Sequence, residues 1–404
     1  MTRAGDTLAA LAGKALVHPR DWQALARINH VADPRRLAIG RVLTIPAVLL
    51  RREALTASIA AFSGQVAVVP GGAARVGAAI GEGAVLQTGA NSFVTLALSD
   101  GSRVTLPSQS RIRIEALQRV VLDGRLERRF AIEAGRGDFG VTPRERDTDR
   151  FLVRTPVAVA AVRGTEFRVA HDDRRASSVI GVVEGNVAGR AQAARAEIAV
   201  PAGAGAVIGI AAARTAVLLP PPGLEHPGRV QDDPAVLLTT DRTPGVVRRV
   251  QLARDAGFID LFAETETATN DARFENVANG TIYARLTAID GDGVEGLPAS
   301  YAIERFLSGI DASAGAMPGP PRRTLFRWQP SGSGTRSYDF VLARDAALVD
   351  RIIDAPGLAG TEMTVTGLAP GSWFWRVTVT ASDGGKRFTR VFPVRTLTIA
   401  APER

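Results

Sequence analysis

The sequence predicts a mainly β chain whose only helical part is a small α+β unit (βααβ) in the first 50 residues. The 404 residues include 41 Gly and 23 Pro, which favours short strands joined by turns over long helices. From about residue 57 onward apolar and polar residues alternate, which is the period of a strand with one buried face. The alternation is clear at Val94, Leu96, Leu98, Val104 and Leu106. This length suggests about two to four domains with cores of their own.

Residue usage narrows the chemistry that the chain can perform. It has no Cys, and its four His show neither HExxH nor paired spacing, so we expect no disulfide, metal site or cofactor. The net charge is +8, and residues 1–52 carry nine basic and three acidic side chains. This excess favours an anionic polymer or surface as a partner of the N-terminal part. Aromatic residues make up 5% and are expected in cores, which disfavours nucleic-acid binding.

The helical pattern is confined to residues 1–50. Asp6 or Thr7 is expected to cap a first helix, and a second helix is expected from Pro19 to Asn29. The expected buried positions recur at helical spacing: Leu8, Leu11, Ala12 and Ala15, then Trp22, Leu25, Ala26 and Ile28. Short strands at Met1–Ala4 and over residues 37–46 complete the predicted βααβ unit.

The strings GDTLAALAGKAL, DWQALARIN and DPRRLAIGRVLTIP in this unit resemble the LysM domain, which binds polymers of N-acetylglucosamine. The resemblance covers almost all of residues 1–50, although the first strand is reduced and lacks the usual aromatic residue. It implies peptidoglycan, or another N-acetylglucosamine glycan, as the partner. It also implies a sugar groove between two neighbouring loops, formed by Gly5, Asp6, Thr7, Leu8, Asn29, His30, Val31, Ala32 and Asp33.

The loop residues also allow an interpretation without a ligand, because Asp6, Thr7 and Asn29 are residue types that cap helix ends. An N-acetyl sugar requires hydrogen-bonding groups for its acetamido group and an apolar floor, which short polar loops over Leu8 and Val31 provide. One shallow groove buries few groups, so the expected affinity lies between about micromolar and millimolar. Four arginines either attract peptidoglycan carboxylates or form a solvated basic face: Arg20, Arg27, Arg35 and Arg36.

Residues 57–211 are predicted to form an all-β domain. Its segments GEGAVLQTGANSFVTLALSDGSRVTL, AGRGDFGV, VRTPVAVAAVRGTEFRV, VVEGNVAG and VPAGAGAVIG resemble the FecR domain. The resemblance implies a periplasmic fold of stacked strands that signals or scaffolds at the bacterial envelope. The regulators of this family also carry a cytoplasmic helical piece and a membrane span. We find no uncharged apolar stretch long enough to span a membrane, which puts sigma-factor control in doubt.

The remainder of the chain contains an internal repeat. Leu252-Ala-Arg-Asp255 recurs as Leu342-Ala-Arg-Asp345, 90 residues later, and Arg285 matches Arg376. A period of this size fits a β-sandwich. The second copy, with FRWQP and LAPGSWFWRVTVTASDGG, resembles a fibronectin type III domain. Proline-rich linkers divide the two copies, which are predicted at 218–310 and 320–404.

Several short motifs invite a catalytic or binding role but have simpler explanations. Arg163-Gly164-Thr165 is interpreted as a structural turn. Arg136-Gly137-Asp138 spells an adhesion tripeptide, and we place it in a turn before Phe139. Asp290-Gly-Asp292-Gly293 lacks the full ligand set of a calcium loop and is expected to be a hairpin turn. Trp328, Trp373 and Trp375 are expected in the sandwich core rather than on a sugar platform.

Together the modules predict a non-enzymatic bacterial envelope protein. The LysM-like unit is expected to anchor it to peptidoglycan, and the FecR-like and sandwich domains to act as scaffold or interaction surface for an envelope protein partner. The expected location is periplasmic or otherwise exported, with no signal peptide in this chain. One alternative is a periplasmic signalling component related to FecR-type regulators. Another is a polysaccharide-active enzyme, in which carboxylates such as Glu166 and Glu184 would converge.

Overall fold

The structure is a computed structural model that describes residues 1–401 apart from 144–148, 163, 242–244 and 320. It is 54% strand and 5% helix, which confirms the mainly β fold class. In the described residues, no helix has both the length and the apolar character needed to cross a membrane. The chain divides into two compact units. The first comprises Met1–Gly223, Arg242–Asn270 and Ala284–Ser300, and the second comprises Leu224–Asp241, Asp271–Tyr283 and Tyr301–Arg404.

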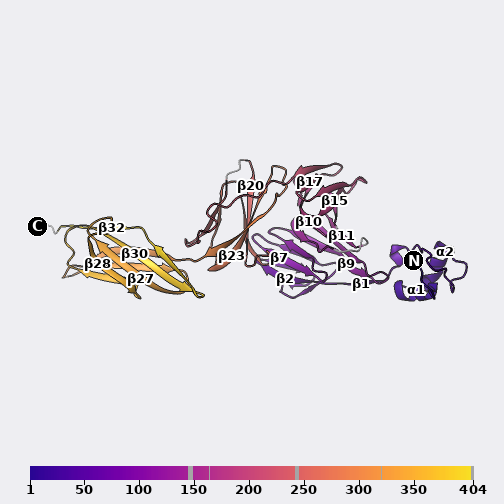
Figure 1. Ribbon diagram of the computed structural model, residues 1–404, viewed down its shortest axis with the longest axis horizontal. Helices are drawn as coiled ribbons and strands as arrows, with labels where there is room; N and C mark the ends of the chain where they lie inside the picture. Colours follow the sequence, from indigo (N-terminus) through magenta and orange to yellow (C-terminus); the bar gives the residue numbers. More distant parts are fainter. Residues whose placement is uncertain (144–148, 163, 242–244, 320, 402–404) are drawn as a thin grey trace. The chain divides into compact units, whose positions relative to one another are not determined.

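The N-terminal part of the first unit contains two helices, α1 (Leu8–Ala15) and α2 (Trp22–Ile28) (Figure 1). A 3₁₀ turn, η1 (Pro19–Asp21), precedes α2, and η2 (Ala47–Leu49) leads into the next domain. Thr7 caps α1 by accepting a hydrogen bond from the Ala10 amide, as predicted, and Asn29 ends α2. The core of this part also takes in Leu50 and Val120, so the helices pack on the end of β9 (Arg111–Val120).

Two expectations for this part are wrong. Residues 1–50 contain no strand, because Thr2 is the only residue of Met1–Ala4 that makes backbone hydrogen bonds with the 37–46 segment: its amide donates to Arg41 O at 3.0 Å, and its carbonyl accepts from Gly40 N at 2.9 Å. A first strand of four residues is too short to hold the 37–46 segment in a ladder. Ile28 does not join the buried stripe of α2 and is 43% exposed, since the helix ends there and its last turn has nothing packed over it.

Two sheets that share β10 (Leu126–Gly140) form the FecR-like region (Figure 1). The first also contains β1 (Arg52–Ala54), β3 (Val66–Val69), β4 (Gly72–Ala73), β6 (Val85–Thr88), β9 (Arg111–Val120), β11 (Arg150–Arg154), β12 (Ala158–Val162), β15 (Asn186–Ala191) and β16 (Ile198–Pro201). The second also contains β2 (Ala57–Ser63), β5 (Ala79–Ile80), β7 (Phe93–Leu98), β8 (Arg103–Leu106), β13 (Glu166–Asp172), β14 (Ser177–Glu184), β17 (Ala204–Ile208) and β18 (Ala213–Val217).

Strand β10 crosses from one sheet to the other at a glycine. Gly135 has φ +72°, and a Cβ there would lie 2.5 Å from Gln109 O, so only glycine fits this bend. The core between the sheets contains a cluster of four phenylalanines, with Phe139 stacked on Phe167 at 5.0 Å between ring centroids. Phe130 and Phe151 complete the cluster. The bend at Gly135 thus lets one strand contribute side chains to both halves of the core.

The first repeat contributes to both compact units. β20 (Val247–Ala253), β21 (Leu261–Thr267) and the 284–289 part of β23 (Gly280–Ile289) belong to the first unit. β19 (Val236–Thr239), β22 (Asp271–Phe274) and most of β24 (Ala299–Arg305) belong to the second. The domain boundaries predicted from the sequence stay predictions.

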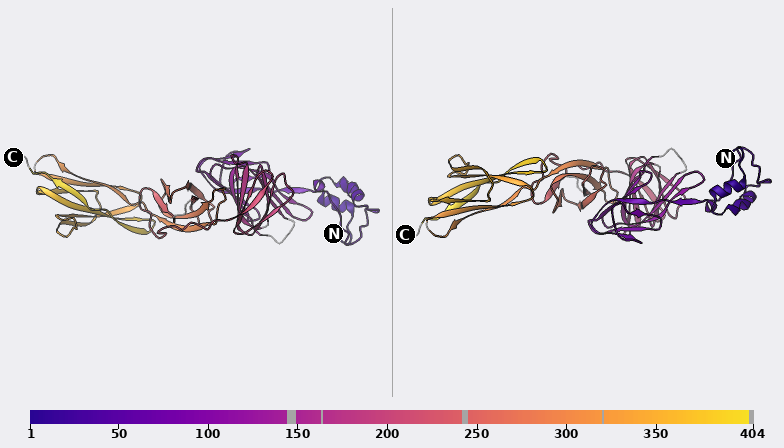
Figure 2. Two further views of the ribbon diagram at one scale, coloured as in Figure 1. Left: turned by 90° about the horizontal axis from the view of Figure 1, so that it is seen from above. Right: turned by 90° about the horizontal axis from the view of Figure 1, so that it is seen from below.

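The second repeat is a two-layered antiparallel sandwich (Figure 2). One sheet is β25 (Gly309–Met317), β26 (Arg323–Ser331) and β29 (Glu362–Thr366). The other is β27 (Thr335–Ala343), β28 (Arg351–Leu358), β30 (Gly371–Asp383), β31 (Lys386–Val391) and β32 (Arg395–Ile399). Trp328, Trp373 and Trp375 lie in the core between the sheets, which confirms the predicted role of these tryptophans.

The repeat seen in the sequence is also a repeat of structure. The first repeat turn, Asp255–Asp260, follows β20, and the second repeat turn, Asp345–Asp350, follows β27. In each, the aspartate carboxylate accepts hydrogen bonds from backbone amides four and five residues later. The fourth residue has positive φ in both, 53° at Phe258 and 59° at Leu348. The two turns therefore share one backbone conformation at the 90-residue offset.

Candidate functional site

The two loops expected to form the sugar groove are neighbours in the structure. The Leu8 amide, at the start of α1, donates to the Pro34 carbonyl at 2.9 Å, which joins the end of the first loop to the end of the second. Leu8 is buried, and Val31 packs against the same small core. Of these two apolar residues only Val31 keeps an exposed part, because Leu8 is 0% exposed, and the sugar groove itself stays a prediction.

Several backbone donors of these loops are free. Within residues 1–50, all of which the structure describes, the amides of Gly5, Thr7, Ala32 and Asp33 have no hydrogen-bond partner. Each of the two loops contributes two of these amides. Free amides suit the carbonyl oxygen of an acetamido group and the hydroxyl oxygens of a sugar.

Other predicted groove residues are engaged within the protein. The Asn29 side-chain amide donates to Leu25 O and Thr44 O, both at 2.9 Å, and its oxygen accepts from Thr44 N at 2.6 Å. Asp6 accepts from the Arg3 amide, and Asp33 accepts from the Arg35 amide. His30 is exposed, with φ 49°. A sugar contact by any of these residues stays a prediction.

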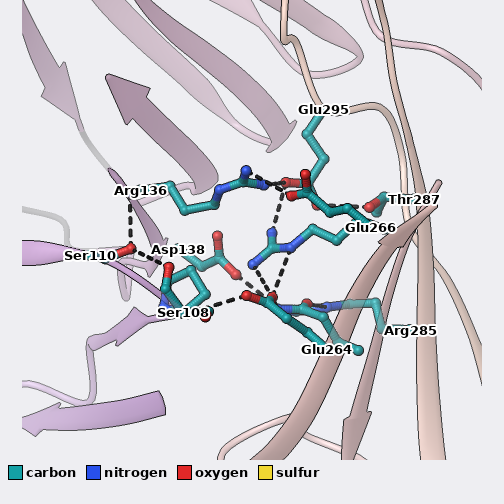
Figure 3. A network of polar contacts seen from close by, with 12 residues as sticks. Ser108, Ser110, Arg136, Asp138, Glu264, Glu266, Arg285, Thr287 and Glu295 are labelled. Carbon is teal, nitrogen blue, oxygen red and sulfur yellow. Dashed lines mark hydrogen bonds and ion pairs between the residues drawn. The ribbon is translucent and has the colours of Figure 1, made fainter. Parts of the chain in front are cut away.

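A second polar site, absent from the sequence prediction, lies where the FecR-like region meets the first repeat (Figure 3). It gathers side chains from β10, β13, β20, β21 and β23, together with Glu295 beyond the turn that follows β23. Four arginines and four acids meet here: Arg136, Arg168, Arg249, Arg285, Asp138, Glu264, Glu266 and Glu295. Because opposite charges are equal in number, the site is close to neutral although several of its members are buried.

Glu295 is the centre of this network. Its carboxylate lies 2.8 Å from Arg249 Nη1 and 3.4 Å from Arg168 Nη1, and the Thr287 hydroxyl donates to it at 2.8 Å. Burial alone would raise the pKa of the Glu295 carboxyl, but the charges of Arg168 and Arg249 outweigh that effect and lower the pKa below its ordinary value. Arg249 is 1% exposed, and Glu295 and Glu264 raise its pKa against the effect of burial. Glu295 and Arg249 are therefore both charged at neutral pH.

The rest of the network spans the junction between the two domains. Arg285 on β23 lies 3.2 Å from Asp138 on β10, and Arg136 lies 2.7 Å from Glu266 on β21. Arg136 and Asp138, the charged residues of the tripeptide Arg136-Gly137-Asp138, lie within β10 and face the first repeat. The prediction that this tripeptide forms a turn is therefore wrong. Gly135 bends the strand without ending it, and the ladder to β13 continues through residue 140. Because Arg136 and Asp138 are paired, they do not form a free adhesion motif.

A sequence signal for this junction existed. Charged or polar residues stand at alternate positions, and so on one face of a strand, in Arg136/Asp138, Glu264/Glu266 and Arg285/Thr287. Such a charged face is usually solvated. Only the fold shows that these three faces cover one another.

The remaining motifs are placed as follows. Arg163 lies outside the described residues. The Asp290–Gly293 segment is the predicted turn, with the Asp290 carboxylate accepting from the Asp292 and Val294 amides. Glu166 and Glu184 are opposite one another on β13 and β14, and both are exposed. The cavity that Glu166 borders measures about 50 Å³, well below the roughly 300 Å³ of small-molecule sites.

Comparison with protein families supports both resemblances. The family model for the LysM domain matches residues 2–46, and that for the FecR protein matches residues 84–188. These matches confirm the two modules recognised in the sequence. No curated protein sequence matches the chain.

Solved structures with similar parts were also found. A candidate anti-sigma factor from Parabacteroides distasonis is 18% identical, with a TM-score of 0.27, and the match covers 33% of this chain and 59% of that one. A segment of two fibronectin type III domains from chicken tenascin is 13% identical, with a TM-score of 0.22 and coverage of 43% and 99%. The fibronectin(III)-like modules of Clostridium thermocellum CbhA are 13% identical, with a TM-score of 0.19 and coverage of 44% and 94%. This chain therefore spans 59% of the length of the anti-sigma factor.

Proposed function

We propose that this protein is a non-enzymatic component of the bacterial envelope that binds peptidoglycan through residues 1–50. The observation that carries the proposal is the pair of adjoining loops, which carry four free backbone amides and the partly exposed Val31, in a segment that matches the LysM domain. The amides would hold the acetamido and hydroxyl oxygens of N-acetylglucosamine, and Val31 would receive the acetamido methyl group. The binding free energy would lie between about −8 and −4 kcal/mol, since one groove buries few groups.

In this proposal the FecR-like region and the first repeat form a scaffold. The buried ion pairs between them, Arg168–Glu295 and Arg285–Asp138, specify one relative arrangement of the two surfaces, because any other would leave these charges without their partners. A fixed arrangement suits a part that presents an interaction surface to an envelope protein.

A pull-down on purified peptidoglycan tests the anchor. Ala32→Glu places bulk and charge beside the free amides at an exposed position, and Gln23→Glu adds the same charge to the exposed surface of α2 as the matched control. Ala32→Glu should abolish retention while Gln23→Glu keeps it, with unchanged circular dichroism for both. Equal retention of the two variants would contradict the groove. In the full chain, chitin oligomers should also shift the amide NMR signals of Thr7 and Ala32.

A second candidate function, envelope signalling, is favoured by the match of residues 84–188 to the FecR protein family. It predicts that deleting the gene changes transcription of a defined set of envelope genes. Peptidoglycan binding without any transcriptional response would leave the anchor and scaffold as the function.

A further inference from the structure

The first repeat turn, Asp255–Asp260, is docked on the FecR-like region. The Thr95 hydroxyl on β7 donates to the Ile259 carbonyl at 2.8 Å, and Arg103 on β8 donates to the Gly257 carbonyl at 3.3 Å. Phe258, at the tip, lies beneath Arg285, with 4.8 Å from the guanidinium carbon to the ring centroid. The two hydrogen bonds from the FecR-like side therefore go to backbone carbonyls of the turn.

The second repeat turn, Asp345–Asp350, has the same conformation, and in the described part of the chain its Leu348 and Val349 carbonyls accept hydrogen bonds only from Arg351, which follows the turn. Val349, the counterpart of Ile259, is 81% exposed, whereas Ile259 is half-buried. Leu348, the counterpart of Phe258, packs on the outer face of the sheet against Val341, Ala343 and Phe374. An exposed apolar tip on an ordered turn is the feature that docking covers in the first repeat.

The arginine beside the turn is repeated as well. Arg285 donates to Gln251 and pairs with Asp138 of the FecR-like region. Its counterpart, Arg376 on β30, stands opposite Val341, which replaces Gln251 and offers no acceptor. Among the residues that the structure describes, none makes a hydrogen bond or ion pair with the Arg376 side chain, and its Nε is buried without a partner. The guanidinium thus lacks both of the contacts that its counterpart has.

We propose that the outer face of β27, β28 and β30, with Arg376 and the second repeat turn, docks the β-sheet face of a second protein of FecR type. That face would present a carboxylate to Arg376, in the place of Asp138, and side-chain donors to the turn carbonyls, in the places of Thr95 and Arg103. A second copy of this chain in its folded form does not offer such a face, because its own first repeat covers it. The partner is therefore a separate protein whose corresponding face is uncovered.

Grafting the turn tests whether it fits a face of this kind. In the full chain, Gly257→Ala, Phe258→Leu and Ile259→Val give the first turn the second turn's sequence. A Cβ at Gly257 would lie 3.1 Å from Asp255 Oδ1, a tight contact within the turn itself, and 3.5 Å from Arg103 Nη1, an ordinary contact. The chain has no Cys, so Thr95→Cys is a single reporter, and Thr95 is 1% exposed when the turn is docked. If the grafted turn docks, it covers the cysteine of Thr95→Cys, and this cysteine should react with maleimide as slowly as it does in the chain with the native turn. Rapid labelling in the grafted chain alone would overturn the proposal.

Cross-linking between chains tests the docking itself, with this chain's own FecR-like face as the probe. The double substitution Arg136→Glu and Arg285→Glu sets like charges against Glu266 and Asp138. It should separate the first repeat from the FecR-like face and so uncover that face. Maleimide labelling of Thr95→Cys verifies the exposure before the cross-linking experiment. Mixed under mild oxidation with a Val349→Cys chain, the uncovered chain should form a disulfide-linked dimer at least ten times more than with Thr364→Cys, an exposed position on the other sheet.

The arginine supplies the decisive control. Asp138 is intact in the uncovered chain, so Arg376→Glu in the Val349→Cys chain should lower the dimer yield about tenfold by setting two carboxylates against each other. Yields from Val349→Cys that match those from Thr364→Cys, or that do not respond to Arg376→Glu, would overturn the proposal.

Discussion

Replacing Glu295 by Gln is the sharpest test of the junction between the FecR-like region and the first repeat. The amide keeps the shape of the side chain and its contact with Thr287, but it removes the negative charge between Arg168 and Arg249. Arg249 is 1% exposed and keeps only Glu264 as an ionic partner within 4 Å among the described residues. Breaking a buried pair in this way costs about 3–5 kcal/mol.

The same charge change on the surface is the control. Glu362 pairs with Arg327 at 3.3 Å, with both side chains about 60% exposed, so Glu362→Gln should cost no more than about 1 kcal/mol. Since 1 kcal/mol shifts the Tm of a large domain by about 2–4 °C, Glu295→Gln should lower the Tm of the first unit by roughly 10 °C. The transition of the second unit should not move.

The assay must separate the two units, because a chain with more than one domain does not unfold in a single step. Three of the four Trp, at positions 328, 373 and 375, lie in the second unit, so tryptophan fluorescence follows mainly that unit. Differential scanning calorimetry detects both transitions. Equal shifts from Glu295→Gln and Glu362→Gln, or a shift confined to the second unit, would refute the role given to Glu295.

Three further predictions follow from named contacts. The pKa of Glu295 is lowered in the folded protein, so its contribution to stability is present above its ordinary value of 4.5 and is lost as the pH falls below it; urea unfolding of the first unit at several pH values should show this loss, and Glu295→Gln should flatten the profile. Asn29→Ala removes three hydrogen bonds and should destabilise residues 1–50 by about 1–3 kcal/mol, seen as faster amide exchange in α2, whereas Gln23→Ala should not. Phe139→Ala should destabilise the first unit by about 3–5 kcal/mol, measured by calorimetry, and a loss below 1 kcal/mol would contradict its place in the core.

Local sequence patterns predicted the secondary structure correctly where interactions between residues close in the sequence determine it. The alternation of Val94 to Leu106 gave strands, the spacing of Leu8 to Ala15 gave a helix, and Thr7 capped it. The repeat of Leu252–Asp255 ninety residues later was found from letters alone, and its turns proved to share a conformation. In these cases the side chains that fix the backbone lie within a few residues of it.

Prediction from the sequence failed where the conformation depends on pairing between segments that are far apart in the sequence. A strand over 37–46 needs a partner strand, and Met1–Ala4 is too short to provide one. A turn at Arg136–Asp138 looked natural beside two glycines, but pairing of β10 with β13 over residues 135–140 holds the segment extended. The ionic junction joins residues such as Asp138 and Arg285, which are 147 positions apart, and no local period reports that pairing.

The two repeats differ where their outer faces would meet a partner, and the differences indicate how the second face binds. Val341 replaces Gln251, and Pro356 stands at the position of Glu266, so the second face carries fewer charges around its arginine. A buried ionic junction needs each charge matched, which makes the first face specific for one arrangement. On the second face, Asp354 lies opposite Val341 and is already paired with Arg351, so fewer charges there need a partner from outside and more of the free energy of docking would come from apolar burial. The affinity of the second face would therefore depend less on salt than the first junction does, as expected of a surface that binds and releases a separate protein.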